Sequence, residues 1–118
     1  MKNNVLQDKS YQFALKTIEI GYLLIANKEF ILSKQLIRSG TSIGANIEEG
    51  IGAHTEKDFH YKLNMAYKEA RETKYWLRLL RDSNQIEESV AIDAIEDIEE
   101  LLRILGSILI TLQKKRRS

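Results

Sequence analysis

Apolar residues recur at alternating intervals of three and four along four successive stretches of this chain. That spacing is typical of amphipathic helices that bury one face. It predicts helices over about residues 8–26, 29–50, 56–82 and 87–114, joined by short connections. No stretch shows the period of two that is typical of a strand. We therefore predict an all-α fold, an antiparallel up-down-up-down four-helix bundle that forms a single domain over the whole chain.

The first predicted helix carries more apolar residues than one narrow stripe requires. Its regular seam, spaced by four, three, four and three, consists of Tyr11, Leu15, Ile18, Tyr22 and Ile25. Phe13, Ile20 and Leu24 lie off that seam. Two explanations remain open, namely a wide stripe facing the core or a subunit interface.

The second predicted helix contains a stretch built for close packing. Leu36, Gly40, Ile43 and Ile47 share one side. Glycine costs a helix up to about 1 kcal/mol relative to alanine, so its presence here suggests a packing reason. We expect a neighbouring helix to pack against Gly40 and Gly44.

A polar row runs beside this seam at the same spacing: Ser39, Ser42, Asn46 and Glu49. We expect it to form hydrogen bonds across the bundle or along its edge. Asn46 and Glu49 are the polar residues expected to be partly buried, where they would need partners. Either they fix the packing register, which is the interpretation we prefer, or they face a ligand or RNA.

Local signals mark the ends of the helices. Asn27 is placed to end the first helix or to cap the second. Gly50 and Gly52 predict that the second helix stops in a left-handed conformation. Thr55, with Asp58 three residues later, resembles a capping box that opens the third helix.

Composition narrows the class of protein. The 118 residues include no cysteine, which excludes disulfides and thiolate chemistry, and no proline, which suits long helices. No segment has the length and apolarity of a signal peptide or a membrane span. We expect a soluble, cytoplasmic protein without a membrane partner.

The net charge is only +1, but the charges are segregated along the chain. Basic residues outnumber acidic ones in the third predicted helix, and acidic residues dominate the fourth. The candidate nucleic-acid contacts are four cations on one side of the third helix and a basic tail: Arg71, Lys74, Arg78, Arg81, Lys114, Lys115, Arg116 and Arg117. The structural alternative, which we prefer for the helical cations, is ion pairing with acids of the fourth helix: Asp93, Glu96, Asp97 and Glu100.

Aromatic residues lie between these basic residues: Tyr61, Tyr67, Tyr75 and Trp76. Interleaved aromatic and basic side chains can stack on unpaired bases. We expect instead that these rings pack in a core or in a subunit interface.

The residues needed for catalysis or metal binding are not assembled in the sequence. A phosphate-cradling glycine loop and a G-x-S-x-G elbow are absent, and Ser42 has no histidine on its helix face. His54 and His60, the only histidines, do not supply the three or more convergent ligands of a metal site. We predict no enzyme activity, no cofactor and no metal.

Three stretches together resemble the 23S rRNA-intervening-sequence protein family of bacterial four-helix bundles. They read SKQLIRSGTSIGANIEEGIG at 33–52, TEKDFHYKL at 55–63 and KEARETKYWLRLL at 68–80. The signature positions are Gln35, Leu36, Arg38, Ser42, Ile43, Asn46, Ile47, Glu49 and Gly50. This chain departs from the pattern at Gly44, where proline is frequent, and in lacking the usual proline before the second helix.

The resemblance implies a homo-oligomer, specifically a homopentameric ring. The fold is also similar to that of the accessory protein of diversity-generating retroelements, a basic pentamer that binds a reverse transcriptase and nucleic acid. Two hypotheses follow. The first is an oligomeric accessory factor that binds RNA or DNA, and the second is a scaffold that binds a protein partner and no nucleic acid.

Overall fold

Four helices follow one another along the chain: α1 (Lys2–Ala26), α2 (Phe30–Ile51), α3 (Glu56–Asp82) and α4 (Glu88–Arg117). The computed structural model describes residues 2–117, with side chains described from residue 5. Within that range the structure contains no strand. α1 begins earlier than predicted, and α4 continues through the basic tail, while the other bounds agree to within one residue.

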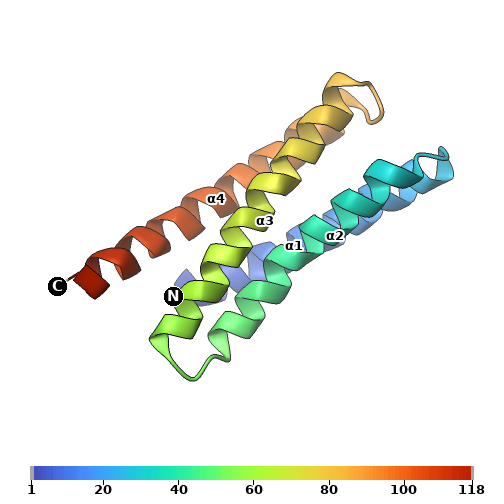
Figure 1. Ribbon diagram of the computed structural model, residues 1–118. Helices are drawn as coiled ribbons and strands as arrows, with labels where there is room; N and C mark the ends of the chain where they lie inside the picture. Colours follow the sequence, from blue (N-terminus) through green and yellow to red (C-terminus); the bar gives the residue numbers. More distant parts are fainter. Residues whose placement is uncertain (1, 118) are drawn as a thin grey trace.

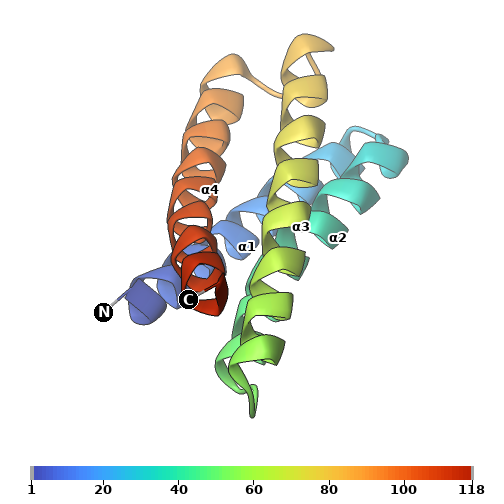
Figure 2. The same cartoon turned by 60° about the vertical axis from the view of Figure 1, so that its left-hand side comes forward.

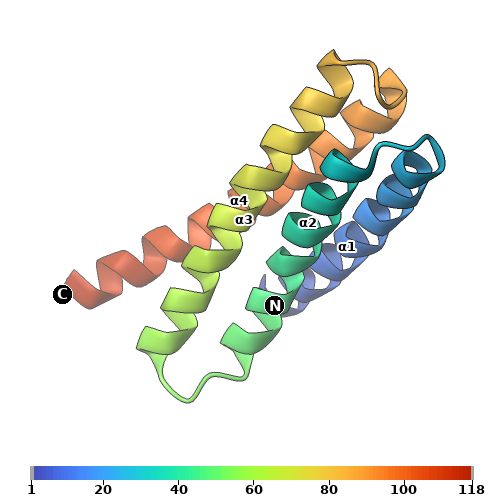
Figure 3. The same ribbon diagram turned by 45° about the vertical axis from the view of Figure 1, so that its right-hand side comes forward.

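The helices run alternately up and down an elongated bundle with dimensions of 50 × 22 × 21 Å (Figure 1). Each helix packs against its neighbour in sequence, and α4 also packs against α1. The α1–α2 hairpin crosses the α3–α4 hairpin at an angle (Figure 2). Both termini lie at the same end as the α2–α3 turn (Figure 3). The predicted antiparallel up-down-up-down four-helix bundle is confirmed.

α1 and α3 occupy opposite corners of this bundle. Each packs against α2 and α4, and among the described residues no Cα atom of α1 lies within 8 Å of one in α3. Their outer faces therefore point in opposite directions, so that a partner can cover one face and leave the other free.

The predicted seams of α2 and α3 form most of the core. Leu36, Gly40, Ile43 and Ile47 of α2 are buried, as the sequence predicted. α3 contributes Leu63, Ala66, Ala70, Thr73, Leu77 and Leu80. In α4 the buried residues are Ala91, Ala94, Ile95, Ile98, Leu101, Leu105 and Ile108. Burial of this apolar surface is the main source of stability of such a bundle.

The predicted seam of α1 was wrong. Tyr11, Leu15, Tyr22 and Ile25 are exposed, and the buried residues come from the other apolar row: Leu6, Phe13, Ile20 and Leu24. Between them lie the buried residues Ser10, Thr17 and Gly21. These small residues have low hydropathy, but they allow α1 to approach α2 closely. Hydropathy therefore favoured the row of larger side chains, which faces outward.

Small residues let α1 and α2 pack tightly. A Cβ atom added at Gly40 would lie 2.5 Å from Cγ2 and 2.8 Å from Cβ of Thr17. At Gly44 the nearest atom, the Ser10 carbonyl oxygen, would be 3.5 Å away, which is ordinary contact. The expected packing of a neighbouring helix is thus tightest at Gly40 and looser at Gly44.

Buried hydroxyl groups in this region are all paired. Thr17 donates to the carbonyl of Ala14 at 2.8 Å, and Ser33 donates to that of Phe30 at 3.0 Å. Ser10 donates to the carbonyl of Gln7 at 3.1 Å. A buried hydroxyl without a partner would cost about 1–3 kcal/mol, so these local bonds allow small polar residues to line a helix interface.

The helix ends differ in part from the sequence prediction. Asn27 is not the cap of α2; Glu29 is, and its carboxylate accepts hydrogen bonds from the amides of Ile31 and Leu32. The left-handed residue of the α1–α2 turn is Lys28, with φ of 65°. Thr55 caps α3 as predicted, since its hydroxyl accepts a hydrogen bond from the Asp58 amide at 3.0 Å.

The predicted left-handed stop after α2 was also wrong. Gly52 follows the last helical residue with φ of −83°, and no described glycine has a positive φ. Gly50 is instead a site of close packing, because an added Cβ would lie 3.1 Å from Cβ of Lys62 on α3. Gly50 therefore lets α3 approach α2 closely, whereas Gly52 lies only against carbonyl oxygens of α2 itself.

Candidate nucleic-acid interface

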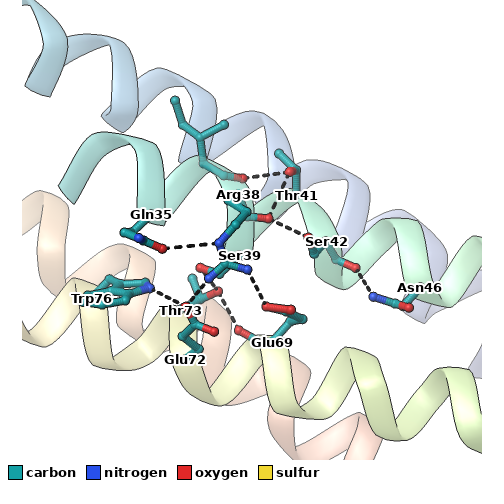
Figure 4. Close-up of polar contacts among 11 residues, drawn as sticks. Gln35, Arg38, Ser39, Thr41, Ser42, Asn46, Glu69, Glu72, Thr73 and Trp76 are labelled. Carbon is teal, nitrogen blue, oxygen red and sulfur yellow. Dashed lines mark hydrogen bonds and ion pairs between the residues drawn. The ribbon is translucent and has the colours of Figure 1, made fainter. Parts of the chain in front are cut away.

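A polar network joins α2 to α3 around Arg38 (Figure 4). The Arg38 guanidinium forms ion pairs with Glu69, at 3.2 Å, and with Glu72. It also donates from Nε to the Gln35 side-chain oxygen at 3.3 Å. Glu72 accepts a second hydrogen bond from the indole N–H of Trp76 at 3.0 Å. Arg38 thus fixes two carboxylates, one of which orients Trp76.

The polar row of α2 bonds both across and along the bundle. The hydroxyl groups of Ser39 and Thr73 form a buried hydrogen bond with each other at 2.8 Å (Figure 4). Ser42 donates to the Arg38 carbonyl, and the Asn46 amide donates to the Ser42 carbonyl at 2.9 Å. The row therefore forms a hydrogen bond across the bundle at Ser39 and hydrogen bonds along α2 at Ser42 and Asn46.

Asn46 and Glu49 were both expected to be partly buried, and only one of them is. Asn46 is half-buried, as expected, whereas Glu49 is exposed. Glu49 forms an ion pair with Lys62 on α3 at 3.1 Å. This partner is the main cause that raises the pKa of Lys62 above its ordinary value.

The four candidate cations of α3 do not behave alike. Arg71 and Arg78 are exposed and form no ion pair with any residue the structure describes. Lys74 forms an ion pair with Glu99 of α4 at 3.1 Å. Arg81 bonds to Asp82, its neighbour in sequence, at 2.8 Å, and this hydrogen bond is the main cause that lowers the pKa of Asp82.

The acids of α4 that were expected to neutralise these cations are directed elsewhere. Lys16 of α1 bonds to Asp93 at 2.5 Å and to Asp97. Lys9 of α1 bonds to Glu100 at 3.1 Å. Glu96 is exposed. The expected ion pairs with the α3 cations are therefore wrong for Asp93, Asp97 and Glu100, because α1 holds these three acids. Pairing between α3 and α4 does occur at Lys74, but with a different acid, Glu99.

The Lys16 ammonium lies partly buried between two carboxylates. Burial alone lowers its pKa, but the hydrogen bonds to Asp93 and Asp97 outweigh burial, so that the pKa of Lys16 rises above its ordinary value. The charged form is therefore the one that joins α1 to α4.

The basic tail forms the last turns of α4 and contacts the start of α3. Lys115 bonds to Glu56 at 2.8 Å, and the Arg116 guanidinium lies 3.4 Å from Nδ1 of His60. Lys114 also has interaction partners, and Arg117 is exposed. Arg71 lies about three helical turns further along α3 than His60, so the structure does not gather the tail and the α3 cations at one point.

The interleaving of aromatic and basic residues on α3 was predicted from the sequence, but the single exposed row that some of them form was missed. At spacings of three and four, an uninterrupted exposed line runs along its outer side, which we call the α3 outer row: Lys57, Tyr61, Asn64, Lys68, Arg71, Tyr75 and Arg78. The same spacing that marks a core seam could have revealed it in the sequence. Tyr67 and Trp76 are partly buried, as expected of packed rings, but Tyr61 and Tyr75 are exposed.

A second exposed surface lies on the opposite corner of the bundle. We call it the α1 outer face; it consists of Tyr11, Leu15, Tyr22, Leu23 and Ile25, all exposed. Beside it, a groove of about 820 Å³ follows the α1–α4 boundary, and Leu15, Ile18 and Tyr22 line it. Several exposed large apolar residues on one helix are typical of an interaction site.

No group of three or more histidine, aspartate or glutamate residues among the described side chains is arranged to hold a metal ion. Of the helices in the described part of the chain, none is both long and apolar enough to span a membrane.

Comparison with known proteins identifies a family and a similar solved structure. The model of the 23S rRNA-intervening sequence protein family matches residues 2–107. A crystal structure of a protein with unknown function from the S23 ribosomal protein family of Bacteroides thetaiotaomicron is 45% identical, with a TM-score of 0.90 over 92% of this chain and 98% of that one. Neither description names an enzymatic activity. No curated protein matches.

Proposed function

This chain belongs to the family of 23S rRNA-intervening sequence proteins, and from that membership we propose that it is a non-enzymatic, cytoplasmic, nucleic-acid-associated accessory factor. RNA is the ligand we favour. The protein acts as a homo-oligomer, a pentamer by resemblance, which presents the same basic surface several times.

The pairing of the α4 acids is the observation that carries this proposal. Lys9 and Lys16 hold Asp93, Asp97 and Glu100 on the α1 side of α4. Arg71 and Arg78 face solvent and form no ion pair among the described residues, although Arg78 helps Arg81 to lower the pKa of the nearby Asp82 carboxylate. Phosphate binding depends on such accessible cations, because they displace the counterions of the nucleic acid.

Oligomerisation is supported by the α1 outer face. Tyr11 and Tyr22 are more than 60% exposed, a large exposure for aromatic residues in a helix that has a separate, fully buried core row. A second copy seated on this face would remove apolar surface from water. The α3 outer row would remain accessible, because α1 and α3 lie at opposite corners. Several weak sites in one ring would then reinforce each other.

The test is binding of a labelled structured RNA and of a shuffled control, measured by fluorescence anisotropy at about 50 and about 200 mM salt. We expect affinity to fall steeply between the two salt concentrations, since binding releases counterions. Discrimination between the two RNAs at the higher salt would indicate a specific partner. Absence of binding at both salt concentrations would contradict the proposal.

A charge-matched pair of variants locates the interface. Replacing Arg71 and Arg78 with glutamine should weaken binding and reduce its salt dependence. The control replaces Lys28 and Lys34 with glutamine, which removes the same charge from two exposed lysines away from α3. Equal loss of affinity in both variants would show a nonspecific effect of net charge.

The alternative function is a protein-binding scaffold, and the α1 outer face is the observation that favours it. A partner protein on this face would compete with self-association. A preparation that remains monomeric and binds neither RNA would support this second function over the first.

A further inference from the structure

The α3 outer row alternates cations with exposed aromatic rings, and this pattern suggests a particular form of nucleic acid. We propose that the row binds a single strand, with Tyr61 and Tyr75 stacking on unpaired bases and the neighbouring cations contacting phosphates. This inference rests on the proposed function and specifies its ligand. Unpaired bases are required because a duplex keeps its base faces inside the stack.

The two tyrosines lie on one line along the helix. Tyr61 is 58% exposed and Tyr75 is 51% exposed. They are about four helical turns apart, a rise of about 21 Å. Lys68 and Arg71 fall between them on the same line. A strand running along α3 would therefore meet a ring, then cations, then a second ring.

Each ring is backed by a side chain that is itself anchored. The Lys62 ammonium lies 5.9 Å from the centre of the Tyr61 ring and is held by Glu49 at 3.1 Å. The Trp76 ring packs edge-on against Tyr75, with centroids 5.3 Å apart, and its indole N–H is held by Glu72 at 3.0 Å. Such support limits ring motion before binding and so reduces the entropy lost when a base stacks.

The charge of the row matches a polyanion. Lys57, Lys68, Arg71 and Arg78 form no ion pair with any described residue. The nearest acid on the same line, Asp82, bonds to Arg81 at 2.8 Å. A single strand carries one negative charge per nucleotide, which complements cations spaced along an extended groove or face.

The experiment compares ring removal with ring retention. A labelled 12-nucleotide uridine RNA, the corresponding thymidine DNA and a 12-base-pair RNA duplex are titrated with the full-length protein. The Tyr61→Leu/Tyr75→Leu variant should bind the RNA single strand at least about tenfold more weakly, since stacking on each aromatic ring contributes substantially to affinity. Duplex affinity should be unchanged. The Tyr61→Phe/Tyr75→Phe variant, which keeps both rings, should restore single-strand binding.

The outcomes separate this inference from the proposed function. If the leucine variant binds the single strand as well as the wild-type protein does, the stacking proposal is overturned. The proposed function would still stand in that case if the Arg71→Gln/Arg78→Gln variant lost binding. If the wild-type protein binds none of the three probes, both fail. If the leucine variant loses the same affinity for the RNA and the DNA single strand, the tyrosines stack on the bases and do not distinguish ribose from deoxyribose, as the proposal allows. A leucine variant with altered mass by light scattering would overturn the inference by showing that the row is a subunit contact.

Discussion

At the scale of single residues, the fit of α1 against α2 depends on Gly40. Its missing side chain leaves room for Thr17, a β-branched residue whose own Cβ would be 2.8 Å from an added methyl group. β-branched side chains have few alternative rotamers in a helix. The clash at Gly40 is therefore harder to relieve than one against a long flexible side chain.

We predict that Gly40→Ala destabilises the bundle by about 1–3 kcal/mol, the usual cost of overpacking a core. Gly44→Ala is the matched control. Its nearest neighbour would be 3.5 Å away, so alanine should be neutral or stabilising by up to about 1 kcal/mol through helix propensity. Urea unfolding of both variants measures the difference. Equal effects at the two glycines would contradict this account of α1–α2 packing.

Lys28 adopts a left-handed conformation between α1 and α2. This conformation costs an ordinary L-residue about 1–2 kcal/mol but is readily adopted by glycine. We predict that Lys28→Gly raises the free energy of unfolding by up to about 1 kcal/mol, reduced by the greater entropy of an unfolded glycine. Thermal unfolding followed by circular dichroism provides the measurement. Lys34→Gly, inside α2, should instead destabilise the protein.

At the scale of elements, α1 illustrates how a helix with two apolar rows is oriented. Both rows carry apolar residues at helical spacing. The row beside Ser10, Thr17 and Gly21 is the buried one, because these small residues allow α1 to pack closely against α2. The other row retains its large apolar residues at the surface. Such retention is readily explained by an additional contact outside the protomer.

Lys16 joins α1 to α4 through Asp93 and Asp97. Because its folded-state pKa is raised, its contribution is fully present below the ordinary lysine pKa of about 10.4 and is lost as pH rises through the folded value. Lys16→Met should lower stability by about 0.5–1 kcal/mol near neutral pH. The difference from the wild-type protein should shrink above about pH 10 in urea titrations. A difference that is constant to higher pH would show that lost packing, rather than charge, is responsible.

At the scale of the whole molecule, the bundle separates two surfaces of different chemistry. The α1 outer face is apolar, and the α3 outer row is basic and aromatic. Their diagonal placement allows assembly and ligand binding at the same time. This arrangement is also compatible with a scaffold that uses the α1 outer face for a different protein.

We predict that the wild-type protein has a solution mass that is a multiple of the 13.7 kDa chain. Tyr11→Glu/Tyr22→Glu should shift the mass toward that of one chain, since burying unpaired carboxylates in an apolar contact is costly. Both tyrosines are exposed in the protomer, so the helical signal should be retained. Light scattering with circular dichroism tests this. Leu79→Glu, an exposed apolar residue on α3, is the control that should leave the mass unchanged.

The sequence alone determined the class of fold, because apolar spacing records which positions of a helix are buried. It also located the seams of α2 and α3, the Thr55 cap and the close packing at Gly40. For the site, it identified Arg71 and Arg78 together with the exposed tyrosines of α3, although it favoured buried rings and paired cations.

Only the tertiary structure decided which of the two apolar rows of α1 faces inward and which helix pairs with Asp93, Asp97 and Glu100 of α4. Both depend on the neighbours across the bundle, since small residues can be buried only where another backbone approaches. α4 packs against both α1 and α3, and sequence spacing carries no information about which of the two supplies the cations for a given acid. The packing of α4 against α1 placed Lys9 and Lys16 beside these acids, and this left the outer cations of α3 exposed.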